Sequence, residues 1–244
     1  MFTAFRMMVL ILTVLLGAAP SFAATLNISG ISGKWVNSSV SSHTRGPLTG
    51  QGTNRIRWGT AANANTTRSS YLFAKSGPIT QVGAGSFLLG RFTHKNGTIW
   101  SNSVDLRHSD LSLNLSGTAD GQAFTLSSAF RMFHRETQNG APVCPAGGRP
   151  CGDLIGIVGL SGAPLVITQG NTVFTIIIDG FVRKLGGKIV NHLITPENRK
   201  RSLFLQASVQ VTTLPPPPPV PLPAAGWLLV GAVGALAALR RRRA

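Results

Sequence analysis

The segment Leu203-Phe-Leu-Gln-Ala-Ser-Val-Gln-Val211 alternates apolar residues with residues that are mostly polar. A period of two places successive side chains on opposite faces of a β-strand, so one face of this segment should enter a hydrophobic core. The residues on that face are Leu203, Leu205, Ala207, Val209 and Val211. Leu111, Leu113 and Leu115 repeat the pattern, so we expect several strands that are buried on one face.

Further runs rich in β-branched and aromatic residues are separated by Gly, Asn, Asp and Ser. The predicted strands cover residues 33–37, 55–58, 71–74, 86–93, 111–115, 123–134, 154–158, 173–182 and 203–211. No stretch between residues 24 and 214 shows sustained helical periodicity. The sequence therefore predicts one all-β domain over residues 24–214, an antiparallel β-sandwich. Asn96-Gly97 and Asp120-Gly121 predict hairpin turns, where positive φ angles favour Asn, Asp and Gly.

The N-terminal residues 1–23 have the order of parts found in a signal peptide. Arg6 supplies a positive charge, an apolar run follows from Met7 to Leu16, and small residues lead to Ala23. The apolar run is too short for a bilayer core of roughly 30 Å, although a buried N-terminal helix is an alternative. We expect signal peptidase to cleave between Ala23 and Ala24.

The C-terminus reads as a stalk followed by a membrane helix. Five prolines begin residues 215–223, and polyproline forms a stiff extended helix. The uncharged residues 224–239 would span about 24 Å as an α-helix, near the lower limit for crossing a membrane. The stop-transfer cluster is Arg240, Arg241, Arg242 and Arg243. The positive-inside rule places the basic tail 240–244 in the cytoplasm, whereas a short core helix is the alternative.

The junction between stalk and helix carries a recognisable motif. It consists of Val220, Pro221, Leu222, Pro223, Ala224 and Ala225, followed by Gly-Trp-Leu-Leu and the arginines. This tail resembles the PEP-CTERM class of sorting signals in its VPLPA variant, and it departs from the commoner form that opens with Pro-Glu-Pro. The resemblance implies recognition by an exosortase-like enzyme in the inner membrane and removal of the tail. The domain would then reach the cell surface or extracellular matrix of a Gram-negative bacterium. A permanent single-pass anchor is the alternative.

A second resemblance covers almost all of the predicted domain. Its pieces are Gly33-Lys-Trp-Val-Asn37, Ile56-Arg-Trp-Gly59, Ser70-Tyr-Leu-Phe73, residues 87–96, His134-Arg-Glu-Thr-Gln-Asn139, Cys144, Cys151-Gly-Asp153, Asp179-Gly-Phe181 and Thr195-Pro-Glu197. The series resembles the THxN family of PEP-CTERM proteins, whose signature corresponds here to Thr93, His94 and Asn96. The resemblance implies a β-sandwich and a mode of anchoring, and no reaction.

His94 is the candidate for chemistry within this motif. Histidine is a common metal ligand and general base, and Glu136, Asp153 and Asp179 could supply carboxylates from neighbouring strands. Neither a catalytic spacing nor a metal-ligand spacing accompanies His94, however. We therefore expect Thr93 and His94 to bond to backbone and hold the Asn96-Gly97 turn, and we predict no metal and no cofactor.

The predicted domain is strongly basic. Removing Arg6 and the four C-terminal arginines from the 23 basic residues leaves 18, against 7 acidic residues, which gives about +11. Such a charge favours anionic partners, above all acidic polysaccharide, while nucleic acid is a less favoured partner. Solubility alone is the alternative, because the charges are scattered except at residues 183–184 and 199–201.

Cys144 and Cys151 flank the sequence Pro-Ala-Gly-Gly-Arg-Pro. In an exported chain we expect them to form a disulfide that pins a local loop. A zinc site is the alternative, but two thiolates do not complete its coordination.

Three functions fit these features. The first is a non-enzymatic surface or matrix protein that binds anionic extracellular polymer. The second is an envelope enzyme acting on polysaccharide through His94 and Glu136, although the sequence contains no catalytic motif. The third is a self-associating structural subunit.

Overall fold

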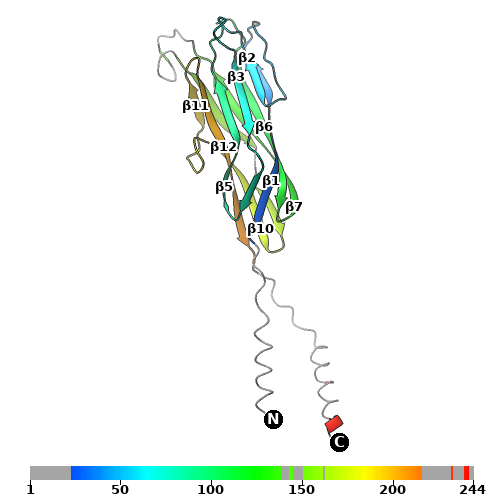
Figure 1. Ribbon diagram of the computed structural model, residues 1–244. Helices are drawn as coiled ribbons and strands as arrows, with labels where there is room; N and C mark the ends of the chain where they lie inside the picture. Colours follow the sequence, from blue (N-terminus) through cyan, green and yellow to red (C-terminus); the bar gives the residue numbers. More distant parts are fainter. Residues whose placement is uncertain are drawn as a thin grey trace. The chain divides into compact units, whose positions relative to one another are not determined.

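The computed structural model (Figure 1) describes residues 23–138, 143–144, 151–161, 163–215, 232 and 239–241. The chain divides into two compact units after Thr213, and all strands of the described residues belong to the first. These strands form two six-stranded antiparallel sheets, which confirms the prediction of an all-β, two-sheet domain.

The first sheet consists, in spatial order, of β11 (His192–Thr195), β8 (Asp153–Ser161), β7 (Gln122–Arg135), β6 (Leu106–Ala119), β1 (Thr25–Val40) and β4 (Ile79–Val82). The second sheet consists of β2 (Arg55–Trp58), β3 (Ser69–Lys75), β5 (Gly85–Lys95), β12 (Lys200–Thr213), β10 (Thr172–Val182) and β9 (Leu165–Gln169). Each of the nine predicted segments lies within one of these strands, whereas the short strands β4, β9 and β11 were not predicted.

The core lies between the sheets and is rich in aromatic rings. Trp35 of the first sheet has its ring centroid 5.1 Å from that of Tyr71 and 5.6 Å from that of Phe92, both in the second sheet. Phe130 and Phe181 make a further contact between the sheets at 5.3 Å. All five side chains are buried, so large apolar areas from both sheets leave water together.

The alternation in the C-terminal strand β12 has the predicted consequence. Its four inward-facing residues Leu203, Leu205, Ala207 and Val209 are buried, while Val211 near the strand end is half-buried. The same strand pairs with β5 on one side and β10 on the other, so it is an interior strand of its sheet.

The two predicted hairpin turns have different outcomes. Asp120 and Gly121 connect β6 to β7 with φ angles of 44° and 84°, so this two-residue turn is confirmed. The prediction at Asn96-Gly97 is wrong, because β5 pairs with β3 and β12 and not with the strand that follows it. The backbone N–H of Asn96 instead donates to the carbonyl of Arg199 at 2.9 Å.

Gly97 is required for close packing. Its N–H donates to Ser69 Oγ at 3.1 Å, and a Cβ atom at this position would lie 1.8 Å from the carbonyl oxygen of Thr67. The fold therefore does require glycine at position 97. The reason is the close approach of two backbone segments and not a hairpin turn.

The predicted disulfide is confirmed. Cys144 and Cys151 are bonded, with their Cα atoms 5.0 Å apart, and Cys151 is buried. The bridge closes a short loop between β7 and β8, as expected from its seven-residue separation.

Several predicted features of the chain ends fall outside the described residues. These are residues 1–22 of the predicted signal peptide, residues 216–219 of the predicted proline stalk, the motif from Val220 to Ala225 and residues 242–244 of the basic tail, which include the last two stop-transfer arginines. Only residues 232 and 239 of the predicted membrane helix are described. In the part of the chain that the structure describes, no helix is both long enough and apolar enough to cross a membrane.

We predict that Gly97→Ala lowers the free energy of unfolding by about 2–3 kcal/mol, because the added methyl group would overlap the Thr67 carbonyl. Gly77→Ala is the matched control, since a Cβ there meets no atom within 4 Å, and its effect should stay within about 0.5 kcal/mol. Urea denaturation followed by tryptophan fluorescence measures both variants. Equal unfolding midpoints would contradict the packing role of Gly97.

Candidate functional site

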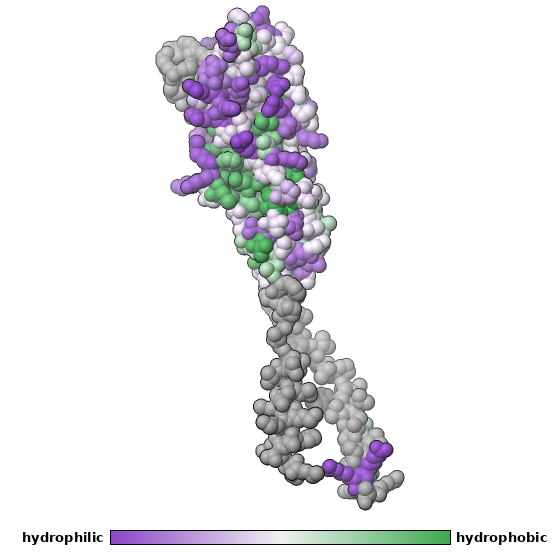
Figure 2. All heavy atoms as spheres, viewed as in Figure 1, coloured by the Kyte–Doolittle hydropathy of each residue, from purple (hydrophilic) through white to green (hydrophobic). Residues whose placement is uncertain are grey.

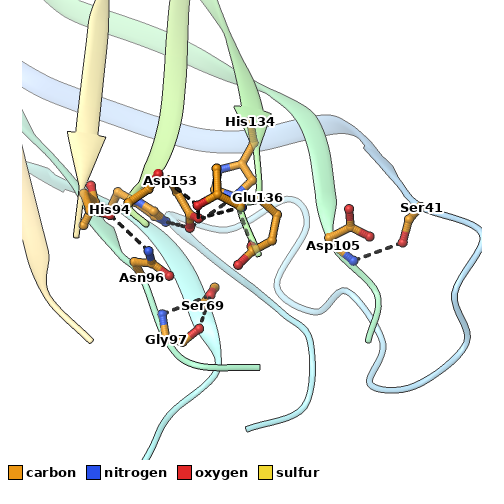
Figure 3. A network of polar contacts seen from close by, with 12 residues as sticks. Ser41, Ser69, His94, Asn96, Gly97, Asp105, His134, Glu136 and Asp153 are labelled. Carbon is orange, nitrogen blue, oxygen red and sulfur yellow. Dashed lines mark hydrogen bonds and ion pairs between the residues drawn. The ribbon is translucent and has the colours of Figure 1, made fainter. Parts of the chain in front are cut away.

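A cluster of buried polar side chains lies where the ends of strands from both sheets meet (Figure 3). His94 comes from the end of β5 in the second sheet, while His134 near the end of β7 and Asp153 at the start of β8 come from the first sheet. In β5 and β7 the histidines continue the inward-facing series that contains Phe92 and Met132. The same alternation that builds the core therefore carries two imidazoles into its end.

The two histidines converge on one carboxylate oxygen of Asp153. Asp153 Oδ2 lies 3.8 Å from His94 Nε2 and 3.6 Å from His134 Nε2. Glu136 adds a second carboxylate, with Oε2 3.3 Å from His134 Nε2. The side chains of His94, His134 and Asp153 have no exposed surface, whereas that of Glu136 is 20% exposed. Glu136 thus connects the buried cluster to solvent.

Hydrogen bonds fix the outer atoms of two members. Tyr71 Oη lies 2.9 Å from His134 Nδ1, and Asp153 Oδ1 accepts a bond from the backbone N–H of Thr137 at 3.2 Å. These contacts leave His134 Nε2 and Asp153 Oδ2 directed toward the centre of the cluster.

His94 is held by ring contacts. Its imidazole stacks on Trp58 with an interplanar angle of 3° and centroids 6.0 Å apart, and it meets Tyr71 edge-on at 5.3 Å. Neither ring nitrogen has a hydrogen-bond partner among the described residues. A buried polar atom without a partner is costly, so this arrangement calls for an explanation.

Burial controls the charge states within the cluster. Burial lowers the pKa of His94 well below its ordinary value, and the nearby His134 lowers it further. Burial also raises the pKa of Asp153 to about 9, with added repulsion from Glu136 and then Glu197 outweighing the bonds from Thr137. Without a cation, His94 is therefore neutral and Asp153 is protonated at neutral pH.

The residues of the Thr93-to-Asn96 motif face opposite sides of the sheet. Thr93 lies on the outer face, where its hydroxyl is 2.8 Å from the Ser202 hydroxyl. His94 and Asn96 are buried, and Asn96 Nδ2 donates to the carbonyl of Thr195 at 3.0 Å. The expectation that Thr93 and His94 hold a hairpin is thus wrong, because strand alternation separates them and no hairpin forms here.

Of the three proposed carboxylates, Asp153 lies beside His94, and Glu136 lies beside His134. Glu136 and Asp153 belong to the cluster, whereas Asp179 accepts hydrogen bonds elsewhere from Gln206 and Ser208. His134 was not predicted as a site residue. Its position in the inward series of its strand was the available signal.

The outer face of the second sheet contains a separate basic groove of about 780 Å³. Its cationic residues are Arg55, Arg57, Arg68, Arg91, Lys95 and Lys200, and no acidic residue lines it. Figure 2 shows hydrophilic side chains gathered over the part of the domain where β2 and β3 lie. Of the predicted basic cluster at residues 199–201, only Lys200 lines the groove.

Strand register places these charges in rows. Arg57 is opposite Ser70, Ser70 is opposite Lys95, and Lys95 is opposite Lys200, so one row crosses four strands. Directly opposed like charges are destabilising. Among the described residues, none of the six cations forms a salt bridge, although Arg68 donates to the backbone carbonyls of Pro47 and Arg57.

No protein-family model matches this chain, and no curated protein matches it. The relationship to the THxN and PEP-CTERM proteins therefore stays a prediction that rests on the quoted motifs.

We predict that Tyr71→Phe lowers the free energy of unfolding by about 1–2 kcal/mol, because it removes the only described partner of His134 Nδ1 in a buried site. Thr80→Val is the control, since it removes an exposed hydroxyl bonded to Asn27 and should cost less than about 0.5 kcal/mol. Chemical denaturation compares the two variants, and a Tyr71→Phe protein as stable as the parent would rule out a contribution from this bond.

Proposed function

We propose that this protein is exported to the surface or extracellular matrix of a Gram-negative bacterium, where its β domain binds an acidic polysaccharide. The observation that carries the proposal is the groove on the second sheet, which has six cations and no acidic lining residue. Six of the 18 basic residues of the domain therefore line one surface that a ligand can reach.

The opposed pair Lys95 and Lys200 supports a ligand-binding role. Two ammonium groups on adjacent strands repel each other, and a bound anion would relieve that repulsion. Hydroxyl groups of Thr93, Ser70 and Ser202 lie among the cations and can bond to sugar hydroxyls or carboxylates. Each guanidinium group can bind a carboxylate through two parallel hydrogen bonds.

The lining also favours polysaccharide over single-stranded nucleic acid. Proteins that bind single strands without sequence preference combine cations with aromatic rings on which bases stack. The groove lining contains no aromatic residue, and Leu72 is its one strongly apolar residue. The binding experiment below also tests double-stranded DNA as a ligand.

Export is supported by features at both ends and by the disulfide. The order of charge, apolar run and small residues before Ala23 is typical of a secretion signal, and the proline motif with four arginines is typical of a sorting tail. The bond between Cys144 and Cys151 fits an oxidising compartment. Signal peptidase and an exosortase-like membrane enzyme are the proposed processing partners.

The burial of His94 favours binding over the envelope-enzyme alternative. A catalytic histidine must come within hydrogen-bond reach of its substrate. The side chain of His94 has no exposed surface and stacks on Trp58, and of the proposed pair only Glu136 reaches solvent. Self-association of the domain would not explain why six cations line one groove, so this alternative accounts for less of the structure.

We predict that the triple variant Arg57→Glu, Lys95→Glu, Lys200→Glu lowers the affinity for alginate at least tenfold, because it reverses the charge of the row across the groove. Arg183→Glu, Lys184→Glu, Lys188→Glu is the control, since it makes the same charge change at exposed positions outside the groove. Biolayer interferometry on the full-length protein in detergent measures both.

Parent binding should weaken steeply as salt rises, because exposed charges are screened over about 8 Å at physiological ionic strength. Neutral dextran should not bind. Equal losses in the two triple variants would refute the groove as the binding surface, and tighter binding to duplex DNA than to alginate would refute polysaccharide as the ligand.

We also predict that Pro221→Ala together with Pro223→Ala traps the precursor in the inner membrane, because the extended proline backbone would no longer fit a processing enzyme. The parent protein should lose the segment 224–244 and move outward. Fractionation of the native host and mass mapping of the C-terminus measure both. An intact arginine tail on parent protein at the inner membrane would instead support a permanent anchor.

A further inference from the structure

We propose that His94, His134 and Asp153 bind one divalent transition-metal ion of the zinc type, with Glu136 beside His134 on the solvent side of the site. The ligand atoms of the first three residues all lie within 4.8 Å of one another. This site is separate from the basic groove and adds a function beyond the proposed binding of polysaccharide.

The distances from Asp153 to the two histidines fit ligands of a shared ion better than direct hydrogen bonds. Asp153 Oδ2 is 3.6 Å from His134 Nε2 and 3.8 Å from His94 Nε2, and both separations are too long for hydrogen bonds. Zinc bonds of about 2.0–2.1 Å place neighbouring ligands of a tetrahedral site about 3.4 Å apart. The two separations from Asp153 are within about 0.4 Å of this value, and the two imidazole ligand atoms lie within 4.8 Å of each other.

Unpartnered buried atoms give an independent argument. Neither nitrogen of His94 has a hydrogen-bond partner among the described residues, and the same holds for Asp153 Oδ2. Both side chains have no exposed surface. An ion at the centre of the cluster would satisfy one nitrogen of His94 and the carboxylate oxygen together.

The surrounding contacts prepare the ligands. Metal-bound histidines usually donate their second N–H to an oxygen, which fixes the ring orientation. Tyr71 Oη lies in that position for His134 Nδ1, at 2.9 Å. The backbone N–H of Thr137 donates a hydrogen bond to Asp153 Oδ1, so Oδ2 remains available to bind the ion. Tyr71 and Thr137 are therefore positioning residues.

The donor set selects the class of metal. Two imidazole nitrogens and one carboxylate suit zinc and neighbouring transition metals, whereas magnesium and calcium prefer sites made of oxygen. The carboxylates of Asp153 and Glu136 would neutralise a dication in this buried setting. Because His94 belongs to the second sheet and the other ligands to the first, the ion would cross-link the two sheets at this end.

Glu136 also offers a path from solvent. It lines a cavity of about 540 Å³ together with His43, Trp100 and Asp105. The oxygen of Glu136 nearest His134 is 3.3 Å from that ring, so an ion held first by Glu136 could pass to the buried ligands.

The first experiment measures metal in the full-length protein, purified in detergent without chelators. Mass spectrometry of the elements should find about one zinc-type ion per chain. After removal of metal, zinc at 100 times its dissociation constant should raise the unfolding temperature by ~5–10 °C. Cobalt should give the visible absorption of a tetrahedral site. A stripped parent protein that takes up neither ion would overturn the proposal.

The second experiment compares Asp153→Asn and His94→Gln with the control His43→Gln. His43 forms a similar contact with Asp105 at 3.7 Å, but its side chain is 48% exposed. The two cluster variants should lose zinc affinity at least tenfold, and the control should keep the parent value. Asp153→Asn keeps the bond from Thr137, so its circular dichroism should match that of the parent.

A folded Asp153→Asn protein with parent zinc affinity would place the ion elsewhere and overturn the site. Loss of affinity in His43→Gln alone would assign the ion to the surface pair of His43 and Asp105. If both cluster variants fail to fold, the parent protein decides. It must then take up zinc, and its cobalt form must show the absorption of a tetrahedral site. Tyr71→Phe should then lower the affinity about tenfold.

Discussion

Strand β5 pairs with β3 on one side and β12 on the other, and its side chains alternate between two environments. Arg91, Thr93 and Lys95 face the basic groove, while Phe92 and His94 are buried in the core. The backbone bonds on both sides prevent this strand from slipping, and a slip of one residue would exchange the two sets of side chains. The groove and the buried cluster both depend on this register.

The polar cluster is the part of the core that apolar burial does not explain. A desolvated polar atom without a partner costs about 1–3 kcal/mol, and His94 and Asp153 both contain such atoms. Apolar residues of similar volume would avoid this cost, so stability alone does not account for the residue types. A bound cation explains the convergence of the side chains, their spacing and the hydrogen bonds on their outer atoms together.

The sequence was sufficient to predict the strands but not the sites. Period-two patterns reveal which residues of a strand are buried, so β7 and β12 were predicted well. The Asn96-Gly97 signal failed because a local turn preference cannot show which strands pair, and the fold uses Gly97 for close packing. The sites required knowledge of pairing as well. Arg57 and Lys200 share a row only through the register of three strand pairs, and His134 meets His94 only when the two sheets pack.

The short loop closed by Cys144 and Cys151 lies close in sequence to the buried cluster on both sides. The first cysteine follows β7, which carries His134, and only Gly152 separates the second cysteine from Asp153. The disulfide restricts the conformations of the unfolded chain between these points. Less entropy is therefore lost when folding brings the two strand ends together. In addition, Thr137 Oγ1 donates to the carbonyl of Gly152 at 3.0 Å, which joins the two ends directly. The disulfide and this bond therefore hold Asp153 beside His134 from within the first sheet, so that only His94 must be supplied by the second. A polar site between two layers needs fewer contacts across the layers in this arrangement, because the first sheet holds two of the three side chains next to each other.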